Sequence, residues 1–414
     1  MQYEPANHDG EGLARQHDVV DGVSAPLAPD AAARLLLRGA RVGRDESRER
    51  WLAAVADDSV DWASLVDLAT HEGTAPLLHW HLRHLDILRR LPRAARNRLI
   101  DVATGVWARS AVLAASWGEA VGALRQAGVE TLTLKGMALA HTVYPAPELR
   151  PMADLDLLVH PADRVRAVDT LMSLGYRTPG PEAERHAASR CFAELVRGGI
   201  LVDLHWDIAR YLRFEGVLRV DHEGLWRRAQ PLALAEGRSL ALCPEDMLLH
   251  LVLHLTLGSD FTRVLWYADI DAMIRRYAGE LDWEQVVDEG RRWRICALLD
   301  WTLSVVHASF GTPLPPGLQA RLAPGRLRRA AVARCIGVTW PPSLGSSLVE
   351  TRVYPAQTLL MDRRVDVLRV LAWTFFPSGT WLRFHYELEA PWKVPVYRAV
   401  HPLRVCWRAV RPLR

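Results

Sequence analysis

The sequence predicts an α+β protein in which a small mixed sheet is embedded in a mainly α-helical chain. Apolar residues recur at spacings of three and four over residues 29–128 and again after residue 244, which is typical of amphipathic helices. Between these regions, residues 129–243 contain short β-rich runs separated by glycine turns. The sheet is therefore expected in the middle of the chain.

The chain divides into five predicted segments. They are a disordered tail (1–28), an N-terminal helical region (29–128), an α/β core (129–243), a C-terminal helical domain (244–390) and a basic tail (391–414).

Capping and stop signals locate several of the helices. Residues 94–127 are rich in alanine and predict one or two long helices that end at Gly128. Asp61 and Ser64 offer capping oxygens at the start of an earlier helix. Pro244, followed by two acids, marks the start of the first helix after the core.

Four runs within the core predict strands or hairpins. "VETLTL" (129–134) and "ADLDLLV" (153–159) predict single strands. "SRCFAELVRGGILVDLHWDI" predicts a hairpin in which Gly198 and Gly199 form a two-residue turn. Residues 231–243 predict a second, shorter hairpin.

The basic tail contains arginines, one lysine and no acid. Such a segment can bind a membrane surface or an acidic partner. Pro391, Pro395, Pro402 and Pro412 are expected to interrupt any long helix here. A solvated, partly packed tail is therefore the favoured prediction.

Composition excludes several classes of protein. The net charge of +3 does not predict nucleic-acid binding, and the five scattered cysteines form no CxxC pair or zinc spacing. The chain has no signal-peptide pattern and no run of 18 apolar residues, so a cytoplasmic protein without a transmembrane segment is expected. Walker A, GxGxxG, GxSxG and kinase signatures are also missing.

Two carboxylates share one face of the predicted 153–159 strand. Side chains at i and i+2 of a strand point the same way, so Asp154 and Asp156 should lie side by side. Like charges at this distance repel unless a cation lies between them. Mg²⁺ is the natural cation, because it takes one or two carboxylates together with substrate phosphates.

A third acid lies on the hairpin strand "LVDLHWDI". Apolar residues alternate there with Asp203, His205 and Asp207. If this strand lies beside the 153–159 strand, Asp203 can join the pair, and three carboxylates could hold two metal ions. His205 shares the acidic face and would either contact the nucleotide or orient Asp203.

The turn in "TLTLKGMALAH" carries one of only two lysines in the chain, Lys135 and Lys393. Lys135 lies at a predicted strand–helix junction, where free N–H groups attract an anion. Gly136 would allow a phosphate to approach the backbone closely, and Arg150 could hold a second phosphate.

The Lys-Gly turn, the Asp-x-Asp strand and the later strand with a third acid together resemble the nucleotidyltransferase superfamily that includes DNA polymerase beta. They are more closely similar to a little-characterised bacterial nucleotidyltransferase family with a Lys-Gly turn. The wider superfamily has Gly-Ser at this turn. The matching runs are "LKGMALAHTVY", "RPMADLDLLV", "LGYRT", "VDLHWDI" and "PEDMLLHLVLH", which cover roughly residues 129–280.

The resemblance implies an NTP-dependent transferase with Mg²⁺ on Asp154, Asp156 and Asp203. It would move a nucleoside monophosphate from an NTP such as ATP to an unidentified acceptor: a small molecule, a peptide, a protein or an RNA end. Two alternatives stay open. One is a non-catalytic nucleotide-binding or scaffold protein, and the other is a kinase-like phosphotransferase that uses the same site.

Overall fold

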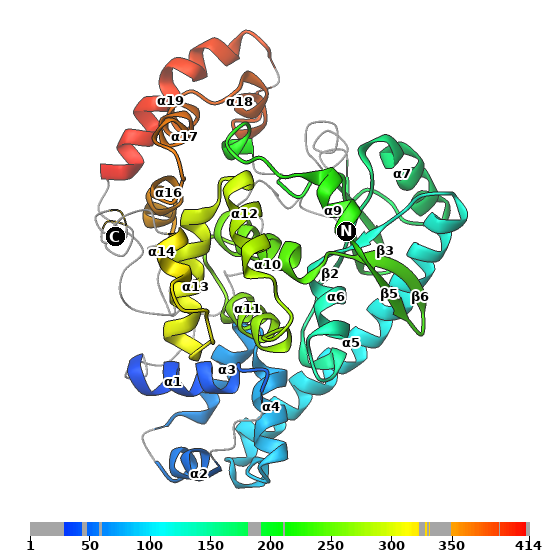
Figure 1. Ribbon diagram of the computed structural model, residues 1–414, viewed down its shortest axis with the longest axis vertical. Coiled ribbons are helices and arrows are strands. Elements are labelled where there is room, and N and C mark those ends of the chain that lie inside the picture. Colours follow the sequence, from blue (N-terminus) through cyan, green and yellow to red (C-terminus); the bar gives the residue numbers. More distant parts are fainter. Residues whose placement is uncertain are drawn as a thin grey trace, which may run out of the picture.

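The computed structural model describes most of the chain, and the predicted tail 1–28 and the last four residues lie outside the described part. The described residues are 29–43, 48–57, 60–180, 192–209, 212–322, 328, 331, 349–388 and 390–410. They form many helices around one six-stranded sheet, which confirms the predicted α+β class (Figure 1).

The N-terminal region is helical, as predicted. Its elements are α1 (Pro29–Gly39), α2 (Arg48–Ala56), α3 (Trp62–His71), α4 (Ala75–His84), the 3₁₀ turn η2 (Leu88–Arg90) and α5 (Arg93–Gln126). The predicted cap at Asp61 is confirmed, because its carboxylate accepts hydrogen bonds from the N–H groups of Ala63 and Ser64 at 3.0 and 3.1 Å.

α5 is one continuous helix of 34 residues, and Gly128 follows it with a left-handed φ of +72°. The sequence predicts no membrane span. Among the described residues, however, α5 is long and apolar enough to cross a membrane by length and composition, with 22% of the relevant window buried. One such helix is weak evidence, because core helices pass the same test. α5 packs on α3, α4, α7 and the sheet.

The sheet is mixed, with strand order β3-β4-β2-β1-β6-β5. Its strands are β1 (Leu132–Thr133), β2 (Asp154–Leu158), β3 (Phe192–Arg197), β4 (Ile200–His205), β5 (Gln230–Leu234) and β6 (Gly237–Ala241). Both predicted hairpins, β3–β4 and β5–β6, are confirmed. Gly198 and Gly199 turn between β3 and β4 with φ of +57° and +77°, which favours glycine at both positions.

β2 and β4 lie side by side and run parallel. This arrangement confirms the adjacency on which the predicted grouping of acids depended. Asp156 is paired with Asp203 across the two strands. Directly paired residues point to the same face, so both acids lie on one side of the sheet.

α5 covers the opposite face of the sheet. Thr133 is paired with Leu157, and its hydroxyl accepts a hydrogen bond of 2.9 Å from Nε1 of Trp117 in α5. Leu155 and Leu157 are fully buried, whereas Asp156 points the other way because strand side chains alternate. The acids therefore face α6 (Lys135–Thr142), which follows β1 directly and packs on β2.

Short helical elements connect the strands. They are η3 (Pro147–Leu149), η4 (Pro161–Asp163), α7 (Arg164–Ser173), η5 (Leu212–Phe214) and α9 (His222–Arg228).

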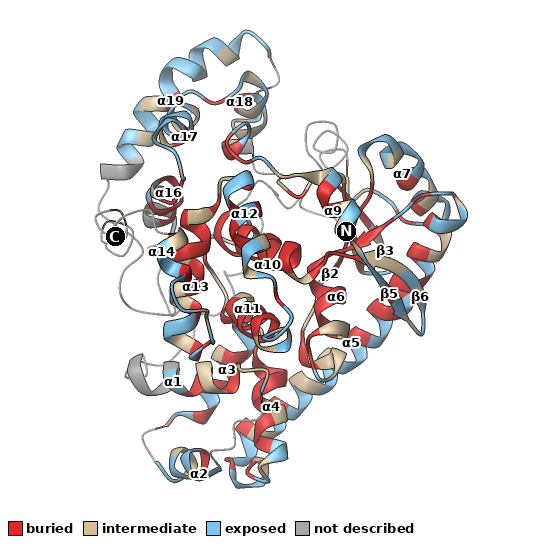
Figure 2. Ribbon diagram, in the orientation of Figure 1, coloured by how far each residue is buried: buried red, intermediate tan, exposed pale blue. Residues whose placement is uncertain are grey.

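The C-terminal region begins at α10, with Pro244 in the first turn followed by Glu245 and Asp246, as predicted. Its helices are α10 (Pro244–Leu253), the π-helical turn η6 (His254–Gly258), α11 (Val264–Arg276), α12 (Trp283–Trp293), α13 (Cys296–Phe310), α14 (Leu318–Leu322), α16 (Val349–Leu359), α17 (Arg364–Phe375), α18 (Gly379–His385) and α19 (Lys393–Val410). Figure 2 shows that α10, α11 and α13 are largely buried, whereas α17 and α19 are largely exposed.

The prediction that prolines break the basic tail is wrong, because α19 is a single helix of 18 residues with Pro402 inside it. Pro395 lies in the first turn, where a missing N–H costs nothing. His401 secures the helix next to Pro402: its Nε2–H donates to Thr374 O in α17 at 3.0 Å, and its Nδ1 lies 2.7 Å from the Tyr386 hydroxyl. These tertiary contacts offset the hydrogen bond that proline removes.

Candidate active site

The centre of the site is Asp156, in the middle of β2. Lys135 Nζ lies 2.8 Å from its Oδ1, and His205 Nε2 donates to the same oxygen at 3.1 Å. Burial opposes ionisation of this carboxyl, but Lys135 and His205 outweigh it and hold the pKa of Asp156 well below its usual range. These two partners therefore favour the ionised form of Asp156 in spite of its burial.

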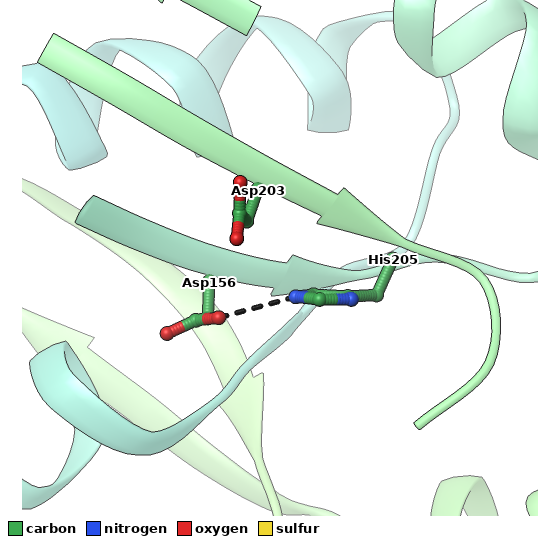
Figure 3. A group of neighbouring side chains, drawn as sticks. All are labelled: Asp156, Asp203 and His205. Carbon is green, nitrogen blue, oxygen red and sulfur yellow. Dashed lines mark hydrogen bonds and ion pairs between the residues drawn. The ribbon is translucent and has the colours of Figure 1, made fainter. Parts of the chain in front are cut away.

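Asp156, Asp203 and His205 form a compact group of potential metal ligands (Figure 3). One ligand atom from each lies within 4.8 Å of the others, and all three side chains are buried. Asp156 comes from β2, and the other two come from alternate positions on β4. Two carboxylates and an imidazole form an oxygen and nitrogen donor set that suits a divalent ion.

Asp154 lies outside this group. It occupies the first position of β2, at the more exposed end of the strand, and is paired with Leu201 in the ladder. The alternation of side chains places it on the same face as Asp156. His205 is paired with Leu158 and so lies beyond Asp156 in the opposite direction along the strands.

The backbone at Lys135 is strained. Its φ of +33° lies in the left-handed region, which a lysine adopts at a cost of about 1 to 3 kcal/mol. The sequence predicts a turn at Lys135 and Gly136, and in the structure the left-handed φ belongs to the lysine. Only 8% of Lys135 is exposed. The strained turn directs its long side chain inward to Asp156.

Arg150 is fixed by an acid from the C-terminal region. Its Nε and Nη2 donate to the two oxygens of Asp269 in α11 at 2.9 and 2.8 Å, and Tyr144 donates its hydroxyl to the same carboxylate at 2.6 Å. Arg150 is 3% exposed and Asp269 fully buried. Burial opposes the charge on Arg150, but Asp269 outweighs it and raises the pKa of the guanidinium. Two of its three nitrogens are thus engaged by protein.

The third nitrogen of Arg150 lies over the Lys-Gly turn. A Cβ placed on Gly136 would lie 2.9 Å from Arg150 Nη1 and 3.1 Å from the Met152 side chain. Because Gly136 has no side chain, the guanidinium of Arg150 can lie close to its backbone. The guanidinium is near enough to Asp156 for that carboxylate to raise its pKa further.

We expect Gly136→Ala to destabilise the protein by about 1 to 3 kcal/mol, because Arg150 cannot move away without breaking its pair with Asp269. The shift in the midpoint of urea unfolding measures this effect. Gly122→Ala is the matched control, since Gly122 lies in α5 with nothing within 4 Å of the added methyl. Helix propensity predicts a gain of up to about 1 kcal/mol there. Equal shifts in the unfolding midpoint of the two variants would contradict the proposed clash between a methyl group at position 136 and Arg150.

Two supporting residues, Tyr144 and Arg109, were not predicted from the sequence, and the pairing of Asp269 with Arg150 was not predicted either. Arg109 on α5 donates from Nη2 to Ala153 O and Gly199 O at 2.9 and 3.1 Å, just before β2 and β4 begin. One signal for Asp269 was present: it lies within the apolar run "VLWYADIDAMI", and a buried acid requires a partner.

Comparison with known protein families agrees with this geometry. A family model described as "Uncharacterised nucleotidyltransferase" matches residues 58–311, which is more than half of the chain. The chain belongs to this family. The match includes every residue named in the site and indicates nucleotidyl transfer as the general activity. No curated protein and no solved structure matches the chain.

Proposed function

We propose that the protein transfers a nucleoside monophosphate from an NTP to an acceptor and releases pyrophosphate. The arrangement that carries this proposal is the register of β2 and β4, which brings Asp156, Asp203 and His205 together in a nucleotidyltransferase family member. In this reaction a bond forms between the acceptor oxygen and the α-phosphorus. The bond from the α-phosphorus to the oxygen of the leaving pyrophosphate breaks.

The carboxylates of Asp154, Asp156 and Asp203 are the proposed Mg²⁺ ligands, because this ion prefers oxygen donors, and His205 would orient Asp156 through its hydrogen bond. Asp156 is ionised despite its burial, as a metal ligand must be. A bound divalent ion supplies charge stabilisation for the phosphates and for the attacking oxygen. The same cation would relieve the repulsion between the paired acids.

The cationic side chains would bind the triphosphate. Lys135 carries a compact point charge at the start of α6, where free N–H groups also favour an anion. In the free protein its ammonium neutralises Asp156, and we propose that it exchanges this partner for a phosphate oxygen when nucleotide binds. Arg150 is held rigidly beside the same turn. Asp203 is the proposed acceptor of the proton from the attacking hydroxyl.

Calorimetry with each NTP, in the presence and absence of Mg²⁺, tests the nucleotide site. We expect Mg²⁺-dependent binding to the full chain. A screen of acceptors that follows pyrophosphate release then separates nucleotidyl transfer from phosphotransfer, because a kinase-like reaction releases a nucleoside diphosphate instead. Failure of every NTP to bind would reject the proposed substrate and favour a scaffold.

We expect Lys135→Arg to weaken NTP binding about tenfold, although the charge is kept, because a planar guanidinium fork cannot replace a compact ammonium in a buried turn. Lys393→Arg is the matched control, since Lys393 is exposed and lies in α19, far along the chain. Calorimetric Kd values of both variants for the NTP measure this effect. An unchanged Kd for Lys135→Arg would show that this lysine does not contact the triphosphate.

A further inference from the structure

α19 presents an apolar stripe to solvent. Its exposed large apolar residues are Val396, Val400, Leu403 and Trp407, and Trp392 lies directly before the helix; Trp392 and Leu403 each expose 70% of their surface. At about 100° per residue the four helical positions fall within an arc of about 60°. The helical stripe is therefore one continuous face about 17 Å long, and Trp392 adjoins its N-terminal end.

The opposite side of α19 packs against the protein. His401 is buried and is bonded to Thr374 O in α17 and to Tyr386 after α18. On the flank between the packed side and the stripe, Arg404 lies over the ring of Tyr386. These contacts fix the orientation of the helix, so the apolar stripe faces outward as a consequence of the fold. Figure 1 shows α19 at the edge of the molecule, away from the sheet.

The neighbouring helix α17 also exposes apolar side chains. α17 packs on α19, and it also exposes large apolar residues: Val365, Leu368, Leu371 and, just after its end, Phe376. Monomeric soluble proteins rarely expose so many large apolar side chains in one region. Apolar residues exposed elsewhere in the described chain, such as Trp107 and Val165, belong to other helices.

The charges of α19 have one sign. Lys393, Arg398 and Arg404 are exposed along the helix, and residues 391–414 contain no acid. The helical repeat places Lys393 and Arg404 next to the apolar stripe. A stripe of Trp, Leu and Val beside basic residues is the composition of helices that lie flat in a membrane interface. The basic flank complements the anionic headgroups of a lipid surface.

We propose that α19 docks the protein peripherally on an anionic phospholipid surface. The helix lies parallel to the membrane plane, with Trp392, Leu403 and Trp407 inserted among the headgroups and the basic side chains against lipid phosphates. The proposal needs no transmembrane segment and does not depend on the nucleotide site.

Sedimentation of the full chain with vesicles tests the proposal. We expect the protein to bind vesicles that contain phosphatidylglycerol and to bind pure phosphatidylcholine vesicles less. Raising the salt from about 0.1 M to about 1 M should weaken binding to the anionic vesicles, because the screening length falls from about 10 Å to about 3 Å. A protein that stays in the supernatant with both vesicles would overturn the proposal.

Leu403→Asp should lower the partition onto anionic vesicles at least about tenfold, because it removes an apolar contact and adds a repelled charge. Val165→Asp is the matched control, since Val165 is 63% exposed on α7 and should leave binding unchanged. Circular dichroism checks that both variants fold. Equal losses in the two variants would overturn the assignment to α19. So would light scattering that finds a dimer which Leu403→Asp converts to monomer without vesicle binding, because a second copy would then cover the stripe.

Discussion

Asp156→Asn should abolish Mg²⁺-dependent NTP binding and lower nucleotidyl transfer on the order of a thousandfold. This carboxylate is part of the proposed metal site and also pairs with Lys135, the proposed triphosphate ligand. It belongs to the group of three potential metal ligands, and it is the partner of Lys135 and His205. A metal ion that stabilises transition-state charge contributes several kcal/mol, so loss of its central ligand costs a comparable amount. Calorimetry and pyrophosphate release measure the two effects separately.

Two control variants show whether the loss comes from the metal site. Asp203→Asn removes a proposed metal ligand but leaves the pair between Lys135 and Asp156 intact, so it should also lose metal-dependent binding. Asp288→Asn removes an exposed carboxylate that pairs with Arg291 at 3.1 Å, and it should retain both activities. Turnover by Asp156→Asn at the wild-type rate would remove this residue from the chemistry.

Asp269→Asn should destabilise the protein by about 3 to 5 kcal/mol. The substitution leaves the buried guanidinium of Arg150 without a counter-charge, and an uncompensated charge in the interior costs this much. The midpoint of urea unfolding measures the change. Asp67→Asn is the matched control, because Asp67 and its partner Arg98 are half-exposed or more, and a surface pair contributes at most about 1 kcal/mol.

A double variant distinguishes the missing charge from other damage at this position. Arg150→Met combined with Asp269→Leu replaces the whole pair with apolar side chains of similar size. Such replacements of buried pairs are often neutral or stabilising. The double variant should therefore be more stable than Asp269→Asn alone, and a sum of two independent losses would contradict the pairing.

The parts of the fold that depend on local patterns were predictable. Two consecutive glycines fix the β3–β4 turn, and the alternation of Asp203 and His205 with apolar residues fixes which face of β4 carries them. The same alternation relates Asp154 to Asp156. Side chains alternate between the two faces of a strand. The residues of one strand therefore show which of its side chains share a face, without knowledge of the neighbouring strands.

The parts that depend on distant contacts were not predictable. Arg150 and Asp269 are 119 residues apart, and no spacing rule joins an arginine before a strand to an acid inside a helix of another region. The left-handed backbone of Lys135 was not predictable from residue type, because glycine is the residue that usually adopts this conformation. Pro402 was misjudged for a similar reason, since contacts of His401 with α17 outweigh a local preference.

The single guanidinium of Arg109 has a mechanical consequence. It grips the peptide carbonyls just before β2 and β4 from one position on α5, a rod about 51 Å long. One side chain therefore fastens the starts of both acid-bearing strands to the helix that covers the opposite face of the sheet. Loss of Arg109 would release both strand starts from α5 at once.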